Sequence, residues 1–92
     1  MNGQTEKTML AVTVNEGLWA SSMAPEGVLE RWRAGYSETI TAGQALAEVR
    51  IEGALHEILA PGPGKLIQSL RAGELVQPGD RLGWVEDNAT AS

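Results

Sequence analysis

The stretch Glu48–Pro61, E-V-R-I-E-G-A-L-H-E-I-L-A-P, carries the strongest structural signal of the chain. Apolar residues alternate with polar ones on both sides of the dipeptide Glu52-Gly53, which is the pattern of half-buried strands. Gly53 can adopt a positive φ without a Cβ clash, so the dipeptide suits a two-residue hairpin loop. The sequence therefore predicts two antiparallel strands, Ala45–Glu52 and Ala54–Ala60.

The register of this hairpin predicts which side chains face the core. A two-residue loop places Val49 opposite His56 on the inner face, and Arg50 opposite Leu55 on the outer face. Leu59 shares the outer face with Leu55. His56 is the only histidine of the chain. A single histidine makes neither a metal site nor a catalytic pair, so we expect a hydrogen-bonded, partly buried core residue.

Composition limits the function. The chain has 92 residues, 42% of them hydrophobic, which is enough for one small domain with one core. It has no cysteine, which excludes disulfides and thiolate chemistry. The net charge of −5 disfavours nucleic-acid binding, including that of an oligonucleotide-binding barrel. No run approaches the ~18 apolar residues of a membrane span, so we expect a cytoplasmic protein.

The rest of the chain predicts an all-β domain. Glycines and prolines divide it into short segments, and no helical periodicity extends over a long stretch. We expect a domain over residues 8–86, with flexible tails at 1–7 and 87–92. Val28 and Trp32 are expected to face inward. Besides the hairpin, the predicted strands are Thr8–Val14, Ala24–Trp32, Lys65–Leu70 and Arg81–Glu86.

The two halves of the chain repeat each other. The segment A-P-E-G-V-L-E-R-W-R-A-G from Ala24 parallels A-P-G-P-G-K-L-I-Q-S-L-R-A-G from Ala60, with a two-residue insertion in the second copy. Further along, T-A-G-Q-A-L-A-E-V parallels Q-P-G-D-R-L-G-W-V, which aligns Leu46 with Leu82. Only two copies are present, so a solenoid is excluded. The repeat predicts a pseudo-two-fold pair of small antiparallel sheets.

The hairpin resembles that of the lipoyl domains of dihydrolipoyl acyltransferases, E-[IV]-E-[TS]-D-K-A-x-x-E-[IV]-x-[AS]-P. The resemblance covers about residues 9–86 and implies the lipoyl/biotinyl fold, a barrel-sandwich hybrid of two small antiparallel sheets. Further matching points are M-A-P at residues 23–25 and A-P-x-x-G-x-L at Ala60–Leu66. The hairpin residues that match are Glu48, Val49, Glu52, Ala54, Glu57, Ile58, Ala60 and Pro61.

The chain departs from this family at the attachment site. Gly53, flanked by Glu52 and Ala54, stands where the family has the lysine that carries lipoic acid. Glycine has no amine, so we expect no lipoyl or biotinyl group and no other cofactor. The sequence also contains no phosphate loop, no paired-carboxylate site and no nucleophile with a base, so we do not expect an enzyme.

Two functions stay open. The first is a non-catalytic binding or assembly module, with a 2-oxo acid dehydrogenase-type or carboxylase-type partner that the resemblance implies. The second is a swinging-arm carrier whose group is attached elsewhere or whose lysine has been engineered away.

Four residues are candidates for an interaction surface. Leu18 and Trp19 belong to the loop that in the lipoyl family lies beside the modified turn, and Leu55 and Leu59 face outward. Together they predict an exposed apolar patch, which suits a protein partner or a homo-oligomer. The alternative is that the loop folds back onto the barrel and buries Leu18 and Trp19.

Overall fold

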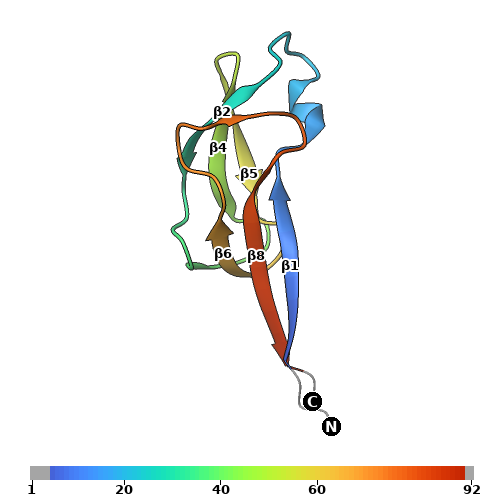
Figure 1. Cartoon of the computed structure of the whole chain (residues 1–92), viewed down its shortest axis with the longest axis vertical. Coiled ribbons are helices and arrows are strands. Elements are labelled where there is room, and N and C mark those ends of the chain that lie inside the picture. Colours follow the sequence, from blue (N-terminus) through green and yellow to red (C-terminus); the bar gives the residue numbers. More distant parts are fainter. Residues whose placement is uncertain (1–4, 91–92) are drawn as a thin grey trace.

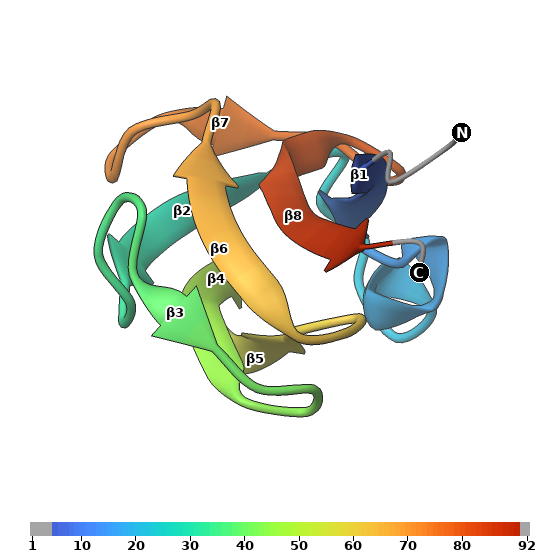
Figure 2. The same ribbon diagram turned by 90° about the horizontal axis from the view of Figure 1, so that it is seen from below.

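The computed structural model describes residues 5–90, with backbone only for 5–7 and 88–90, and it confirms the all-β class. Strands form two antiparallel sheets that face each other as two layers (Figures 1 and 2). The elements are β1 (Thr5–Thr13), the 3₁₀ helix η1 (Glu16–Trp19), β2 (Gly27–Trp32), β3 (Thr39–Ile40), β4 (Ala45–Ile51), β5 (Ala54–Leu59), β6 (Gly64–Gln68), β7 (Leu75–Val76) and β8 (Arg81–Thr90).

The predicted hairpin is β4–β5, and its register is confirmed. Val49 lies opposite His56, and Arg50 lies opposite Leu55. Glu52 and Gly53 both have positive φ, 51° and 88°. Two consecutive positive φ values give the backbone twist of a type I′ turn, which matches the twist of the flanking strands.

The internal repeat appears in the order of the strands and in their hydrogen bonds. One sheet has the order β5-β4-β2-β7 and the other β1-β8-β6-β3, so each strand has a counterpart in the same position. The amide of Arg33 donates to the carbonyl of Leu46 (2.7 Å), and 36 residues later the amide of Ser69 donates to Leu82 (2.9 Å). The carbonyls of Leu46 and Leu82 therefore play equivalent parts, as the aligned sequences predict. Arg33 is equivalent to Ser69, however, and not to Arg71, with which the R-A-G alignment pairs it.

The core lies between the two sheets, and the repeat fills it with matching residues. Leu46 and Leu82 are fully buried, as are Leu29 and Leu66. The prediction that Val28 faces inward is wrong, because its neighbour Leu29 takes the buried position. A bulge between Leu29 and Arg31 shifts the register of β2, so side chains before and after it do not keep a strict alternation.

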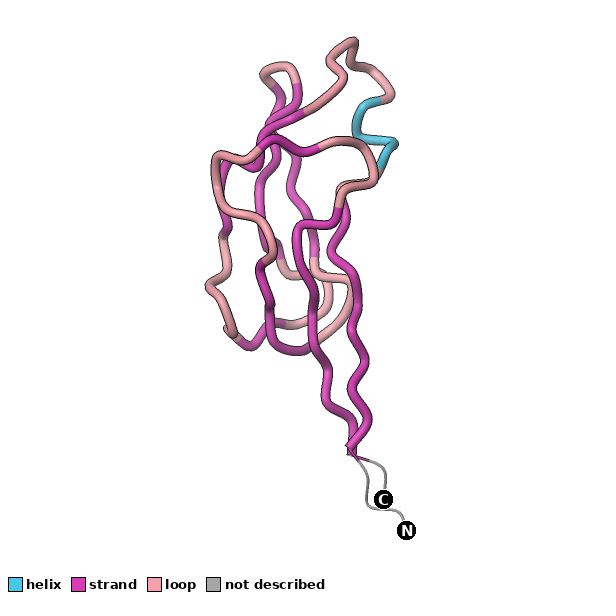
Figure 3. Tube along the Cα trace, viewed as in Figure 1, coloured by secondary structure: helices cyan, strands magenta, loops and turns pink. Residues whose placement is uncertain are grey.

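The strands β1 and β8 pair beyond the predicted domain bounds of 8 and 86. Their register runs from Thr13 opposite Arg81 to Thr5 opposite Thr90. The result is a two-stranded ribbon that projects from the body of the domain (Figure 3). The remaining parts of the predicted tails, 1–4 and 91–92, lie outside the described residues.

Candidate functional site

The sequence resemblance aligns the turn between β4 and β5 with the attachment turn of lipoyl domains. Gly53 is exposed there between the exposed residues Glu52 and Ala54. A Cβ built on Gly53 would have no heavy atom within 4 Å outside its chain neighbours. The site is sterically open, but its φ of 88° lies in the left-handed region that strains any residue other than glycine.

Glu52 links this turn to the loop between β1 and β2. Its Oε1 accepts a hydrogen bond from Ser22 Oγ (2.8 Å) and another from the backbone amide of Met23 (3.0 Å). The Ser22 hydroxyl and then the Met23 amide hold the pKa of Glu52 below its ordinary value, because both bonds favour the charged carboxylate. The loop and the hairpin tip are thus held together by one ionised side chain.

The same loop folds back onto the body of the domain. Asn15 caps η1 by accepting a hydrogen bond from the amide of Gly17 (2.6 Å). Trp19, at the end of η1, is only 8% exposed and belongs to the core. The expectation that Trp19 is an exposed contact residue is therefore wrong, and the alternative in which the loop folds back holds for this side chain. Leu18 is half-buried and packs against the core.

A hollow of about 510 Å³ lies between the loop and the hairpin tip. Leu18, Ile51 and Ala54 give it an apolar part, while His56 and Glu52 give it a polar one. The His56 imidazole is half-buried, as expected, but it makes no hydrogen bond within the described residues, so the expected hydrogen bond is not present. The full lining is Gly17, Leu18, Ser21, Ser22, Ile51, Glu52, Ala54 and His56.

The chemistry of this hollow suits binding. Ser22 Oγ donates to Glu52, but a carboxylate with a lowered pKa is a weak base and does not activate a hydroxyl. The described residues also contain no group of three or more His, Cys, Asp or Glu side chains that could hold a metal ion. An apolar surface beside a fixed carboxylate and an imidazole can accept a side chain with both apolar and polar parts.

Leu55 and Leu59 lie on a different side of the hairpin from the hollow. They are 48% and 53% exposed and face outward from β5, whereas His56 between them faces the hollow. The four residues proposed from the sequence as one interaction surface thus fall in separate places. Sequence reasoning missed Ser22 and Met23, whose contacts with Glu52 span about thirty positions and leave no local signal.

No model of a known protein family matches this chain, and no curated protein matches it. Within residues 5–90, no helix is long and apolar enough to cross a membrane.

Proposed function

We propose that this chain is a lipoyl-like domain, a barrel-sandwich hybrid with pseudo-two-fold symmetry, that acts as a cytoplasmic, non-catalytic binding or assembly module without a swinging arm. The observation that carries the proposal is Gly53, an open turn position without an amine, at the tip of a hairpin that resembles the lipoyl attachment hairpin. The matching strand orders of the two sheets support the fold assignment.

The positions of the lysines support the absence of an attached group. The chain has lysines only at positions 7 and 65. Lys65 lies within β6, between partners Glu86 on β8 and Thr39 on β3, and not in a turn. The side chain of Lys7 lies outside the described residues. Lys65 therefore does not present its amine at the tip of a hairpin, as attachment of a mobile arm requires.

The hairpin tip supports recognition of a protein. Met23 is 94% exposed beside the turn, and its amide is bonded to Glu52. The hollow next to it offers Leu18 and Ala54 as apolar contacts and His56 as a polar one. A partner that inserts a side chain into the hollow and covers Met23 would use the tip without any covalent chemistry. We assign this partner to the 2-oxo acid dehydrogenase-type or carboxylase-type components.

Titration of the ¹⁵N-labelled protein with a purified component of each enzyme class tests this proposal. We expect amide shifts at Ser22, Met23 and Glu52 with one of the two classes. The variant Glu52→Ala releases the loop from the tip and should weaken that binding by at least about tenfold. The matched control is Glu26→Ala, because the Glu26 side chain makes no hydrogen bond or ion pair within the described part of the chain.

Two outcomes would overturn the proposal. If neither component shifts the amides at the tip, the partner assignment fails. If the intact protein purified from its native host carries a lipoyl or biotinyl group, the alternative function of a swinging-arm carrier replaces the binding module.

A further inference from the structure

The outer face of the sheet β5-β4-β2-β7 carries apolar side chains that no described part of the chain covers. Leu55 and Leu59 on β5 are exposed, and Leu75 on β7 is 60% exposed. Only three other large hydrophobic residues among those described are exposed, and they are Met9, Met23 and Tyr36. Half of this exposed apolar set therefore lies on one sheet face, which is a common feature of protein interfaces.

These side chains form a symmetric pattern across the four strands. Leu75 lies opposite Val28, Val28 opposite Arg50, and Arg50 opposite Leu55. The row begins and ends with an exposed leucine. Its two central residues, Val28 and Arg50, are half-buried and offer a methyl surface and an aliphatic stem. The order of side chains along this row is therefore similar from either edge of the sheet, with a leucine at each end and an apolar surface between them.

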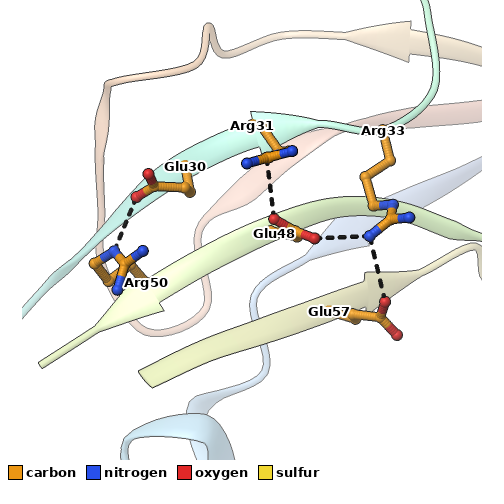
Figure 4. A network of polar contacts seen from close by, with 6 residues as sticks. All are labelled: Glu30, Arg31, Arg33, Glu48, Arg50 and Glu57. Atoms are coloured by element: carbon orange, nitrogen blue, oxygen red, sulfur yellow. Dashed lines mark hydrogen bonds and ion pairs between the residues drawn. The ribbon is translucent and has the colours of Figure 1, made fainter. Parts of the chain in front are cut away.

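The charged groups on this face neutralise one another (Figure 4). The Glu48 carboxylate contacts Arg31 Nε at 3.1 Å and Arg33 Nη1 at 2.7 Å. Arg33 also lies 3.7 Å from Glu57, and Arg50 Nε lies 3.0 Å from Glu30. Three arginines thus face three glutamates, although the whole chain has a net charge of −5. A second copy can approach this face without the repulsion that acts between negatively charged surfaces.

We infer that two copies of the chain pair face to face through this outer surface, about a two-fold axis. The axis lies in the interface, parallel to the strands and over the gap between β2 and β4. This axis exchanges β5 with β7 and β4 with β2, because the strand order is β5-β4-β2-β7. Leu55 of one copy then covers Leu75 of the other, and Glu48 of one copy faces Arg31 of the other. The interface is isologous and closed, so it stops at a dimer. The inference does not rest on the proposed function, since it is argued from Leu55, Leu75 and the charges of the outer face and not from Gly53 or the hollow.

Crosslinking tests the geometry, because the chain has no cysteine of its own. Leu55→Cys and Leu75→Cys are made in separate chains, mixed, and treated with a short bis-maleimide. We expect efficient crosslinking in the mixture and little with either variant alone, since identical positions would lie about three strand spacings apart, roughly 14 Å. The control mixes Leu55→Cys with Met9→Cys, which is exposed but belongs to the other sheet. Equal crosslinking in the two mixtures would overturn the inference.

Sedimentation equilibrium tests the association itself. The dimer should have a Kd that rises at least about tenfold in Leu55→Ser/Leu75→Ser. Met23→Ser, at the hairpin tip, should leave the Kd unchanged. Circular dichroism and thermal unfolding show whether each variant is folded. A wild-type protein that stays monomeric up to millimolar concentration contradicts the inference, as does a folded double variant with an unchanged Kd.

Discussion

The two sheets share a strand order but differ at the ends of their long strands. In one sheet β4 and β5 close in the turn at Glu52 and Gly53. In the other, the equivalent strands β8 and β1 continue as a ribbon to the pair Thr5 and Thr90. The repeat thus sets the core, while the places where the halves diverge are the candidates for function.

The outer faces of the two sheets also differ, in how far their apolar side chains are covered. On the sheet that contains β8, Trp84 is half-buried, and the Arg81 guanidinium lies 4.4 Å from the centre of its ring. A cation over an aromatic face is attracted by the ring electrons and also shields them from water. The sheet that contains β4 has no such cover over Leu55 and Leu75. This contrast is the reason why we propose the dimer on the sheet that contains β4.

The largest effect on stability is expected at two glycines in corresponding positions of the two sheets. Gly27 packs against β4, and Gly64 packs against β8. A Cβ on Gly27 would lie 2.8 Å from the carbonyl oxygen of Arg50, and a Cβ on Gly64 would overlap that of Glu86. Gly64 also has a φ of 145°, where other residues are strained. We expect Gly64→Ala to destabilise the fold by about 3–5 kcal/mol and Gly27→Ala by about 1–3 kcal/mol, as measured by urea unfolding. Equal costs, or a milder effect at Gly64, would contradict this order.

The paired core leucines should respond alike. Leu46 and Leu82 are both fully buried, and each carbonyl accepts two backbone amides from the residues directly after β2 or β6. Truncation of either to alanine should cost about 2–5 kcal/mol, and the two costs should agree within about 1 kcal/mol. Denaturant midpoints of the two variants give the comparison. A much larger difference would show that the two halves do not share the core equally.

A smaller effect on stability is expected at two equivalent turns, where a serine and a glycine both have a positive φ. Ser37 has a φ of 68° and Gly73, its counterpart 36 residues later, a φ of 97°. Their amides donate to the carbonyls of Leu66 and Leu29, each at 2.7 Å. Ser37→Gly should stabilise the fold by up to about 1 kcal/mol, and Gly73→Ser should destabilise it by about 1–2 kcal/mol. Thermal unfolding measures both. Changes of the same sign would refute the equivalence of the turns.

The smallest effect is expected at Glu52, which links the hairpin tip of one sheet to a loop. Its pKa is lowered by the hydrogen bonds from Ser22 and Met23. Since the folded pKa lies below the unfolded one, the contribution of these bonds is complete above the unfolded pKa and is lost as the pH falls through the folded pKa. An NMR titration of the Glu52 carboxyl carbon should show the lowered pKa, and Ser22→Ala should raise it. A pKa at or above the ordinary value in the wild type would contradict the contacts at the tip.

The sequence was sufficient for the hairpin and the repeat because both depend on local spacing. Alternation with a period of two and a two-residue loop fix the register of β4 and β5. Gly43 and Gly79 mark equivalent turns, and Leu46 and Leu82 mark equivalent core positions. Such features can be read along the chain without knowledge of distant contacts. The repeated Ala-Gly does not mark equivalent turns, because Ser37 and not Gly35 is the counterpart of Gly73.

The errors come from features without a local signal. The bulge after Leu29 inserts one residue and moves Val28 out of the predicted inner position. Strands β3 and β7 have two residues each, which is too short for a periodic pattern. Burial of Trp19 and the bonds from Ser22 to Glu52 depend on how a loop folds against a distant hairpin. These tertiary contacts define the candidate site.

Whether the hairpin tip is a lipoyl-type turn that lacks only its amine is tested by the intact mass of the wild type and of Gly53→Lys after incubation with a lipoyl ligase, ATP and lipoic acid. We expect no change in the mass of the wild type, because the turn has no amine. We expect one added lipoyl group for Gly53→Lys, since the site is sterically open and the left-handed φ of 88° adds only about 1–2 kcal/mol of strain. A lipoyl domain with its natural lysine serves as the positive control. Modification of the wild type, or a folded Gly53→Lys protein that stays unmodified, would contradict the account.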